Sequence, residues 1–480
     1  MAGIGFELKK IFNREGFLSN IKAYFLSALV IVGPTMICLA TVTFLELFLT
    51  LAGIEQKQRE LFMAIVTYSF VFSLILTNGF SMLVTRYVSD KIFSEEYNEI
   101  LPSLYGVITV CLMIGGVIGA VFYYFSPLNF SLKFSAYILF MQLIIIWLLS
   151  AYISIFKDYM RIVKGFIMGL FVALICSLIF MKILSLESVL SCLLGLNTGM
   201  FIIILGFMLH MKVFLMTDGK NYFRFLSYFD KYPSLFFVGL FYAAGIYIHN
   251  FVFWTGDLRV VLQNTYTYCP YYDVPSFYAM LTIVTGMVIF VVTIETSFYE
   301  KYKKYYTAVC GTGKLEDINS FKNEIYRVLT QELSYAMVFQ LVLSLLFMIM
   351  GMYLLPKIGF TAVLLDMFKI LTLGSYGCIF MFIIMLLLLY FDDRKGALLI
   401  SALFMFGNLL LTYITYKLGE SFYGLGFFLA TMLSLFVGFL RLIVFIKGIN
   451  YYTFCAQPIY VTEKKRFFTK LAITLEGLLK

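Results

Sequence analysis

Residues 275–309 read PSFYAMLTIVTGMVIFVVTIETSFYEKYKKYYTAV. The stretch begins as an apolar run that carries one carboxylate, Glu295, near its end, and it continues as tyrosines and lysines. About 20 apolar residues are enough to cross the hydrocarbon layer as a helix. Tyrosine and lysine are typical of the boundary between lipid and water. The stretch therefore predicts a transmembrane helix with an aromatic and basic exit.

The whole chain has the composition of a membrane protein. Of its 480 residues, 62% are hydrophobic and 13% are charged, and the mean hydropathy is +0.93. A soluble domain carries about 25% charged residues. A protein core cannot hide this much apolar surface, so most of it must face lipid or other helices within the membrane.

Twelve apolar runs are long enough to span a bilayer, which predicts an all-α polytopic membrane protein with about twelve transmembrane helices. They lie at residues 22–50, 61–86, 101–126, 134–156, 163–181, 188–213, 233–254, 275–298, 331–356, 370–391, 396–417 and 421–446.

Lysine and arginine predict the orientation. With the N-terminus in the cytoplasm, 28 of the 36 Lys and Arg residues fall in segments on the inner side. This is the positive-inside pattern, so we expect both termini in the cytoplasm and the protein in the cytoplasmic membrane. The start lacks an apolar signal region, and we expect it to be retained. The net charge of +9 fits this bias and attraction to anionic lipid, not nucleic-acid binding.

The runs divide into two groups of six, and both ends of the chain are amphipathic. The expected parts are an amphipathic cytoplasmic helix at 1–21, a six-helix bundle at 22–213, a cytoplasmic linker at 214–232, a second six-helix bundle at 233–447 and a cytoplasmic tail with an amphipathic helix at 448–480.

Cysteine and histidine give no sign of a metal site. The eight cysteines lie mostly inside apolar runs without CxxC spacing, and the chain has two histidines. We expect neither a metal nor a cofactor.

A polar stripe follows the eighth run. At 100° per residue, Glu295, Tyr299, Tyr302 and Tyr306 fall on one face of a helix. The stripe fits an interfacial belt of tyrosines. It equally fits the mouth of a route for a hydroxyl-rich substrate, because tyrosine offers sugars both a ring face and a hydroxyl. We treat these four residues as candidates for the substrate pathway.

The second run carries a similar face. Asn78, Thr85 and Ser89 align, with Arg86 and Asp90 beside them, and all five are candidates for the pathway. Arg86 and Asp90 are four residues apart, so a simple ion pair at the helix end is the alternative.

Other polar positions have more ordinary interpretations. Gly33 and Pro34 form a possible hinge in the first run, although kinks are common in membrane helices. Arg441 is expected to extend toward the inner boundary, and Asp366 and Lys369 are expected on an outer amphipathic segment.

Several motifs along the chain together resemble the PelG family of exopolysaccharide exporters, in the polysaccharide-flippase branch of the MOP superfamily. They are MAGIGFELKKIF at the start, then LTNGFSMLVTRYVSDKIF, FKDYMRIV, IETSFYEKYKKYYTAVCGTGKLEDI, YFDDRKGALLISALFMFGNLLLTYITYKLG and FCAQPIY. They occur in order along nearly the whole chain.

The resemblance implies two six-helix lobes around a central cavity bordered by the first, second, seventh and eighth helices. It implies export of a galactosamine-type Pel polysaccharide across the cytoplasmic membrane. The implied partners are a cytoplasmic glycosyltransferase and small membrane proteins of the Pel system, including a cyclic-di-GMP receptor.

Other functions remain open at this point. A lipid-linked oligosaccharide flippase or a small-molecule antiporter could use the same fold. A membrane glycosyltransferase is disfavoured because no loop carries a DxD-like or P-loop motif. A membrane scaffold for a cytoplasmic polysaccharide synthase is less favoured, because a scaffold has no need of polar helix faces. We therefore expect a transporter and not an enzyme.

Overall fold

The computed structural model describes residues 33–215, 219–291, 296–311, 313–456 and 466–478. Within these residues, twelve helices are long and apolar enough to cross a membrane. This confirms the all-α polytopic class predicted from the sequence. The predicted N-terminal helix at 1–21 lies outside the described residues.

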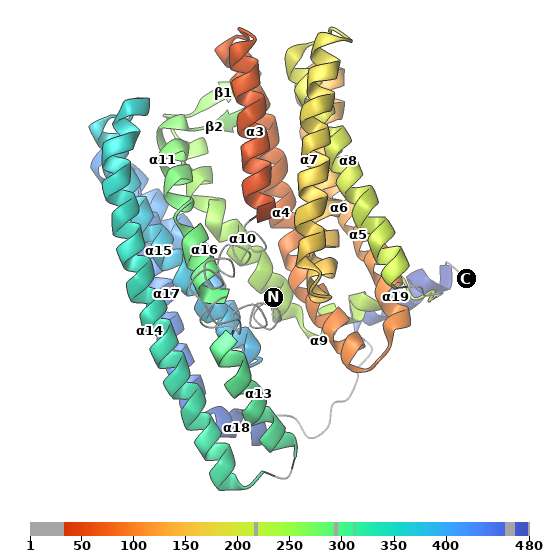
Figure 1. Ribbon diagram of the computed structural model, residues 1–480, viewed down its shortest axis with the longest axis vertical. Helices are drawn as coiled ribbons and strands as arrows, with labels where there is room; N and C mark the ends of the chain where they lie inside the picture. The colour runs from red at the N-terminus through yellow and green to blue at the C-terminus, as the bar shows by residue number, and fades with distance from the viewer. Residues whose placement is uncertain (1–32, 216–218, 292–295, 312, 457–465, 479–480) are drawn as a thin grey trace, which may run out of the picture. The chain divides into compact units, whose positions relative to one another are not determined.

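Within the described residues, fourteen helices form the twelve spans and the segment that follows the eighth span (Figure 1). They are α3 (Gly33–Leu51), α4 (Gln56–Phe93), α5 (Ile100–Tyr124), α6 (Phe130–Ile155), α7 (Tyr159–Lys182), α8 (Ser188–Phe214), α10 (Pro233–Trp254), α11 (Pro270–Met280), α12 (Ile283–Ile289), α13 (Thr296–Cys310), α14 (Leu315–Leu354), α15 (Ala362–Tyr390), α16 (Arg394–Leu418) and α17 (Leu425–Lys447).

Shorter elements connect them. They are η1 (Tyr97–Glu99), η2 (Arg224–Leu226), α9 (Ser227–Lys231), β1 (Val260–Leu262), β2 (Tyr266–Tyr268), η4 (Leu355–Ile358), η5 (Glu420–Phe422), α18 (Ile449–Phe454) and α19 (Phe467–Leu478).

The chain forms two compact units. The first unit contains Val32–Tyr247, Trp254–Tyr268 and Lys464–Lys480, and the second contains Ile248–Phe253 and Cys269–Glu463, each as far as the structure describes it. The second unit therefore begins within α10. The predicted bundle boundaries at 213 and 233 stay a prediction.

In the first unit, α7 packs along α8 at very short range. Gly169 and Ala173 of α7 face Gly195 and Gly199 of α8, and a methyl group added at either of these α8 glycines would overlap the backbone of α7. Small residues at a helix contact let two backbones approach closely, which is a common source of helix association in membranes.

A cluster of charged side chains connects the predicted linker, residues 214–232, to α4 and α5 of the first unit. Glu99, at the start of α5, is 8% exposed and lies between two cations. Its Oε2 is 2.6 Å from Lys91 Nζ, and its Oε1 contacts the guanidinium of Arg224 in η2. Tyr87 donates a further hydrogen bond to Glu99 over 3.1 Å. The described part of the linker is thus a packed part of this unit.

The same linker region holds the C-terminal helix. Asp230 of α9 accepts hydrogen bonds from the backbone N–H of Thr469 at 2.7 Å and from its hydroxyl at 2.8 Å. The ring of Phe468 stacks on Phe229 with centroids 5.1 Å apart. A carboxylate that accepts from the first N–H groups of a helix stabilises that helix.

We therefore expect Asp230→Ala to loosen α19. Loss of a helix cap costs about 0.5–2 kcal/mol, so trypsin should cleave near Arg466 and Lys470 several times faster in the purified variant. Asp317→Ala is the matched control, because Asp317 accepts from the N–H of Lys314 at the start of α14 instead. Equal cleavage near α19 in both variants would contradict the assigned role of Asp230.

A small hairpin belongs to the first unit as well. Strands β1 and β2 pair antiparallel, with Val261 opposite Thr267. The hydroxyl of Tyr68 in α4 lies 2.5 Å from the carbonyl oxygen of Thr267 and 3.0 Å from its backbone nitrogen. The ring of Tyr68 stacks on Trp254 with centroids 5.0 Å apart. The segment between the seventh and eighth predicted runs, residues 255–274, therefore contains a structured hairpin.

In the second unit, α15 is the most deeply buried helix, with α14, α16 and α17 against it. Helix α14 has 40 residues and is about 60 Å long, roughly twice the thickness of the hydrocarbon layer. Its first half carries the charges of Lys322, Glu324 and Arg327. That half and α13, which runs beside it (Figure 1), form a helical hairpin that fills most of residues 299–330, between the eighth and ninth predicted runs.

The eighth span is discontinuous. Its helix breaks between α11 and α12, after a first half that contains Pro275. Gln340 of α14, which is 1% exposed, donates to the carbonyl oxygen of Thr282 at 3.0 Å and accepts from the hydroxyl of Thr285 at 2.9 Å. A buried amide thus satisfies the backbone where the helix is interrupted, as a membrane interior requires.

Candidate functional site

The candidate site lies on α13, which follows the broken span. One side of this helix is buried, and it includes Phe298 and Tyr305. The Tyr305 hydroxyl donates to Asn450 Oδ1 of α18 at 3.0 Å. Lys301 forms an ion pair of 2.7 Å with Glu324 of α14. These contacts fix the rotation of α13, so its remaining face has a defined direction.

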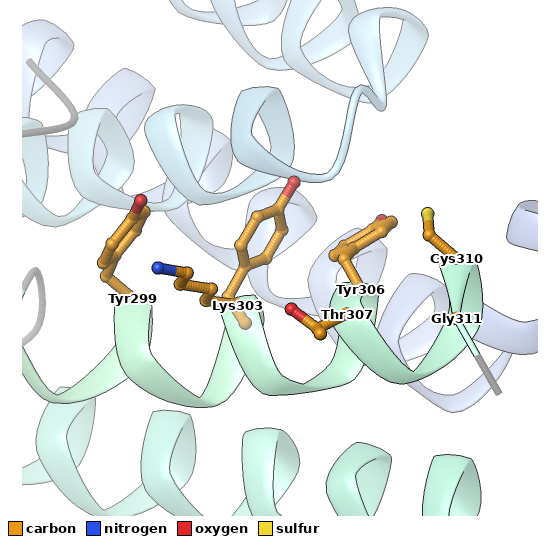
Figure 2. A pocket seen from close by; sticks show the side chains of 7 residues that line it. Tyr299, Lys303, Tyr306, Thr307, Cys310 and Gly311 are labelled. Atoms are coloured by element: carbon orange, nitrogen blue, oxygen red, sulfur yellow. The ribbon is translucent and has the colours of Figure 1, made fainter. Parts of the chain in front are cut away.

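That face forms an open cavity of about 510 Å³, which we call the tyrosine groove. Its lining consists of Tyr299, Tyr302, Lys303, Tyr306, Thr307, Cys310 and Gly311. Figure 2 shows the labelled side chains of Tyr299, Lys303, Tyr306 and Cys310 projecting from the same side of α13.

The middle of the groove is held in place by neighbouring aromatic groups. The Tyr302 hydroxyl donates to the carbonyl oxygen of Tyr390, at the end of α15, over 3.1 Å. Its ring lies 4.6 Å from that of Tyr306 and 5.9 Å from that of Phe391, between centroids. Burial raises the pKa of Tyr306, so its hydroxyl stays protonated at neutral pH and can donate a hydrogen bond.

The composition of the groove suits a carbohydrate. Tyrosine rings present flat apolar faces to the C–H groups of a sugar, and their hydroxyls exchange hydrogen bonds with it. Thr307 adds a hydroxyl, and Lys303 adds three N–H donors. The seven lining residues include no carboxylate. The groove therefore offers aromatic faces for stacking and hydrogen-bond donors.

The structure thus brings together three of the four predicted stripe residues, Tyr299, Tyr302 and Tyr306. Glu295 lies outside the described residues. Helical spacing was enough to group the tyrosines. It gave no sign of the contact between Tyr302 and Tyr390, which is distant in sequence.

The charged residues of the predicted face on α4 contact α9. Arg86 and Asp90 form an ion pair of 3.1 Å. Asp90 also accepts a hydrogen bond from Tyr228 over 3.0 Å, and the Arg86 guanidinium lies 5.3 Å from the ring centre of Tyr232. The ion pair proposed as the alternative for these two residues is therefore present.

The other residues of the predicted face on α4 are Asn78, Thr85 and Ser89. The Thr85 hydroxyl donates to the carbonyl oxygen of Ser81, one turn earlier, over 2.7 Å. Ser89 is exposed, and Asn78 is half-buried where α10 approaches through Gly239. The possible hinge residues Gly33 and Pro34 form the described start of α3.

Three other residues named from the sequence form ion pairs in the structure. The guanidinium of Arg441 forms two hydrogen bonds with Asp393, over 2.6 and 2.9 Å, and its position near the inner membrane boundary stays a prediction. Asp393 was not among the predicted site residues. Asp366 and Lys369 lie within α15 and form an ion pair of 2.5 Å. Asp393 and Arg441 are 48 positions apart in the sequence, so no local pattern could predict their contact.

The model of the PelG family, described as "Putative exopolysaccharide Exporter (EPS-E)", matches residues 1–454. The chain belongs to the PelG family. No curated protein matches it by sequence. The family match confirms the resemblance drawn from the motifs.

Solved structures of MOP-superfamily transporters share the fold of this PelG-family chain. An outward-facing multidrug resistance MATE transporter is 14% identical with a TM-score of 0.58, and the match covers 88% of this chain and 96% of that one. A MOP transporter from Pyrococcus furiosus is 12% identical over 88% and 96%, with a TM-score of 0.55. The MATE transporter ClbM, in complex with Rb⁺, is 15% identical over 88% and 94%, with a TM-score of 0.56.

These findings establish the class of the protein. It is a multi-pass membrane transporter with the MOP fold, in a family of exopolysaccharide exporters. At such low identity the solved structures support the fold alone.

Proposed function

We propose that this chain exports a Pel-type exopolysaccharide across the cytoplasmic membrane, and that the tyrosine groove on α13 contacts the glycan on its way into the transporter. The family match supports an exopolysaccharide as the cargo. The observation that carries the role of the groove is its lining of three tyrosines, a threonine and a lysine around an open cavity of about 510 Å³.

The hairpin of α13 and α14 suits an entry position. About half of α14 extends beyond the length needed to cross the hydrocarbon layer. Lysines are frequent on this hairpin, with Lys301, Lys303 and Lys304 in one turn of α13, and by the positive-inside rule it lies on the cytoplasmic side. A glycan made in the cytoplasm would meet the groove before it reaches the membrane-spanning part.

The partners in this proposal follow from the family. A cytoplasmic glycosyltransferase would supply the chain, and small membrane proteins of the Pel system, with a cyclic-di-GMP receptor, would assemble around the exporter. The protein itself would act as a transporter without catalysis. The route between two helical bundles that the family resemblance implies stays a prediction.

Reconstitution tests the proposal. Purified protein in liposomes should move a fluorescent N-acetylgalactosamine oligosaccharide across the bilayer faster than protein-free liposomes do. The matched variant Tyr302→Ala should reduce this flux, because it removes the central ring of the groove. Flux equal to that of empty liposomes would contradict export. Flux of a lipid-linked diphosphate oligosaccharide in its place would favour the flippase alternative.

A further inference from the structure

One residue that lines the tyrosine groove, Tyr302, contacts the turn between α15 and α16, and a partly buried ion pair lies beside that turn. The turn between α15 and α16 contributes the carbonyl oxygen of Tyr390, which accepts the Tyr302 hydrogen bond. The same turn contributes the ring of Phe391, which packs on both Phe298 and Tyr302 with centroids 5.6 and 5.9 Å apart. The position of this turn therefore sets the position of Tyr302.

Asp393 holds the end of this turn. Its carboxylate accepts a hydrogen bond from the backbone N–H of Gly396 over 3.1 Å and so caps the start of α16. Its two oxygens also accept from Arg441 of α17, over 2.6 and 2.9 Å. The Asp393 side chain is only 5% exposed. A two-point contact between a guanidinium and a carboxylate fixes direction as well as distance.

Arg441 is itself placed by aromatic rings. Its guanidinium lies 6.0 Å from the ring centre of Phe445 and 5.9 Å from that of Tyr452. These two rings stack on each other with centroids 4.3 Å apart. Phe445 also packs on Phe391, at 5.8 Å between centroids. The ion pair and Tyr302 are thus connected by one continuous set of contacts within the second unit.

We infer that Asp393 and Arg441 are positioning residues for the glycan groove: they hold the α15–α16 turn so that the Tyr390 carbonyl oxygen orients the ring of Tyr302 toward the substrate. The inference rests on the proposed function, because it assigns these residues to a groove that binds glycan. If Asp393 and Arg441 contributed only to folding stability, replacing them in a variant that still folds would not change the affinity of the groove for glycan.

Cys310 offers a natural probe, since it lines the groove and is exposed. Cys455 is the other exposed cysteine, and the remaining six are buried or half-buried. In a Cys455→Ser background, a maleimide should label Cys310, and an N-acetylgalactosamine oligosaccharide should slow that labelling. The oligosaccharide concentration that gives half-protection reports the affinity of the groove in the intact protein.

Three variants test the positioning role. Arg441→Lys keeps the charge but loses the two-point contact, Asp393→Asn weakens it, and Tyr302→Phe removes the hydroxyl at the other end of the path. We expect each variant to raise the concentration for half-protection about five- to tenfold, the loss expected for one such hydrogen bond. Combining Arg441→Lys with Tyr302→Phe should raise it little further, because both changes break the same path.

The control variant is Asp158→Asn. Asp158 also caps a helix, by accepting from the N–H of Arg161, and it also pairs with a basic side chain, His210, but in the first unit. It should leave half-protection unchanged. A cooperative thermal unfolding transition of each purified variant shows that it is folded. If Asp393→Asn does not fold, Arg441→Lys still tests the positioning role.

The outcomes are distinct. If the oligosaccharide protects Cys310 of the parent protein and gives the same half-protection concentration in folded Arg441→Lys or Asp393→Asn, that result would overturn the positioning role but leave the groove as a glycan-binding site. Fully additive effects in the double variant would overturn it as well. If the oligosaccharide does not protect Cys310 even in the parent, the groove does not bind glycan, and the proposed site fails together with this inference.

Discussion

Replacing Tyr302 and Tyr306 together by alanine should abolish exopolysaccharide secretion while the protein remains in the membrane at its normal level. The two rings lie 4.6 Å apart at the centre of the tyrosine groove. If each acts as a binding hot spot, the pair accounts for about a hundredfold or more in affinity for the glycan. Secreted polysaccharide measured against membrane abundance in a deletion strain checks this result.

A matched variant separates the groove from a general need for interfacial tyrosines. Tyr451 on α18 is 62% exposed and is not among the residues that line the cavity. Tyr451→Ala should secrete normally. If the double variant of Tyr302 and Tyr306 also secreted normally, the tyrosine stripe would be an interfacial belt and not a substrate contact.

The second large effect concerns stability. Glu99→Gln should destabilise the first unit by about 3–5 kcal/mol, the usual cost of removing one partner from a buried ion pair. Glu99 is 8% exposed and faces both Lys91 and Arg224, so its neutralisation leaves two cations close together. The midpoint of thermal unfolding in detergent should fall sharply, and less protein should accumulate in the membrane.

Glu96 provides the control for that variant, because its carboxylate pairs with the same lysine, Lys91, at 2.6 Å. The Glu96 side chain is 47% exposed. The hydrogen bond and the positive charge of Lys91 lower the pKa of this carboxyl, so it is charged at neutral pH. Glu96→Gln should change the unfolding midpoint far less, since exposed ion pairs are screened by water. Equal shifts in the two variants would contradict the structural importance of the buried carboxylate.

Much of the fold could be predicted because membrane-spanning helices leave a simple pattern in the sequence. Apolar length predicted twelve spans, and the described part of the chain contains twelve suitable helices. The orientation predicted from lysine and arginine stays a prediction. The break in the eighth span was missed: Pro275 hinted at it, but the partner that stabilises the break, Gln340, lies 58 residues beyond Thr282.

Only the part of the candidate site that lies on a single helix could be predicted from the sequence. Spacing along α13 placed Tyr299, Tyr302 and Tyr306 on one face, and these residues line the cavity. The contacts of Tyr302 with Tyr390 and Phe391, and the pair of Asp393 with Arg441, depend on packing between α13, α15 and α17. Such contacts between distant segments carry no local signal, so no pattern within one helix could predict them.

The most direct test of the account is photocrosslinking in cells that secrete the polysaccharide. A photoreactive amino acid in place of Tyr306 should form a covalent adduct with the glycan, and the same amino acid in place of Tyr451 should not. The adduct at position 306 should disappear when synthesis of the polysaccharide is blocked. Glycan captured equally at both positions, or at neither, would contradict the claim that the tyrosine groove receives the exported chain.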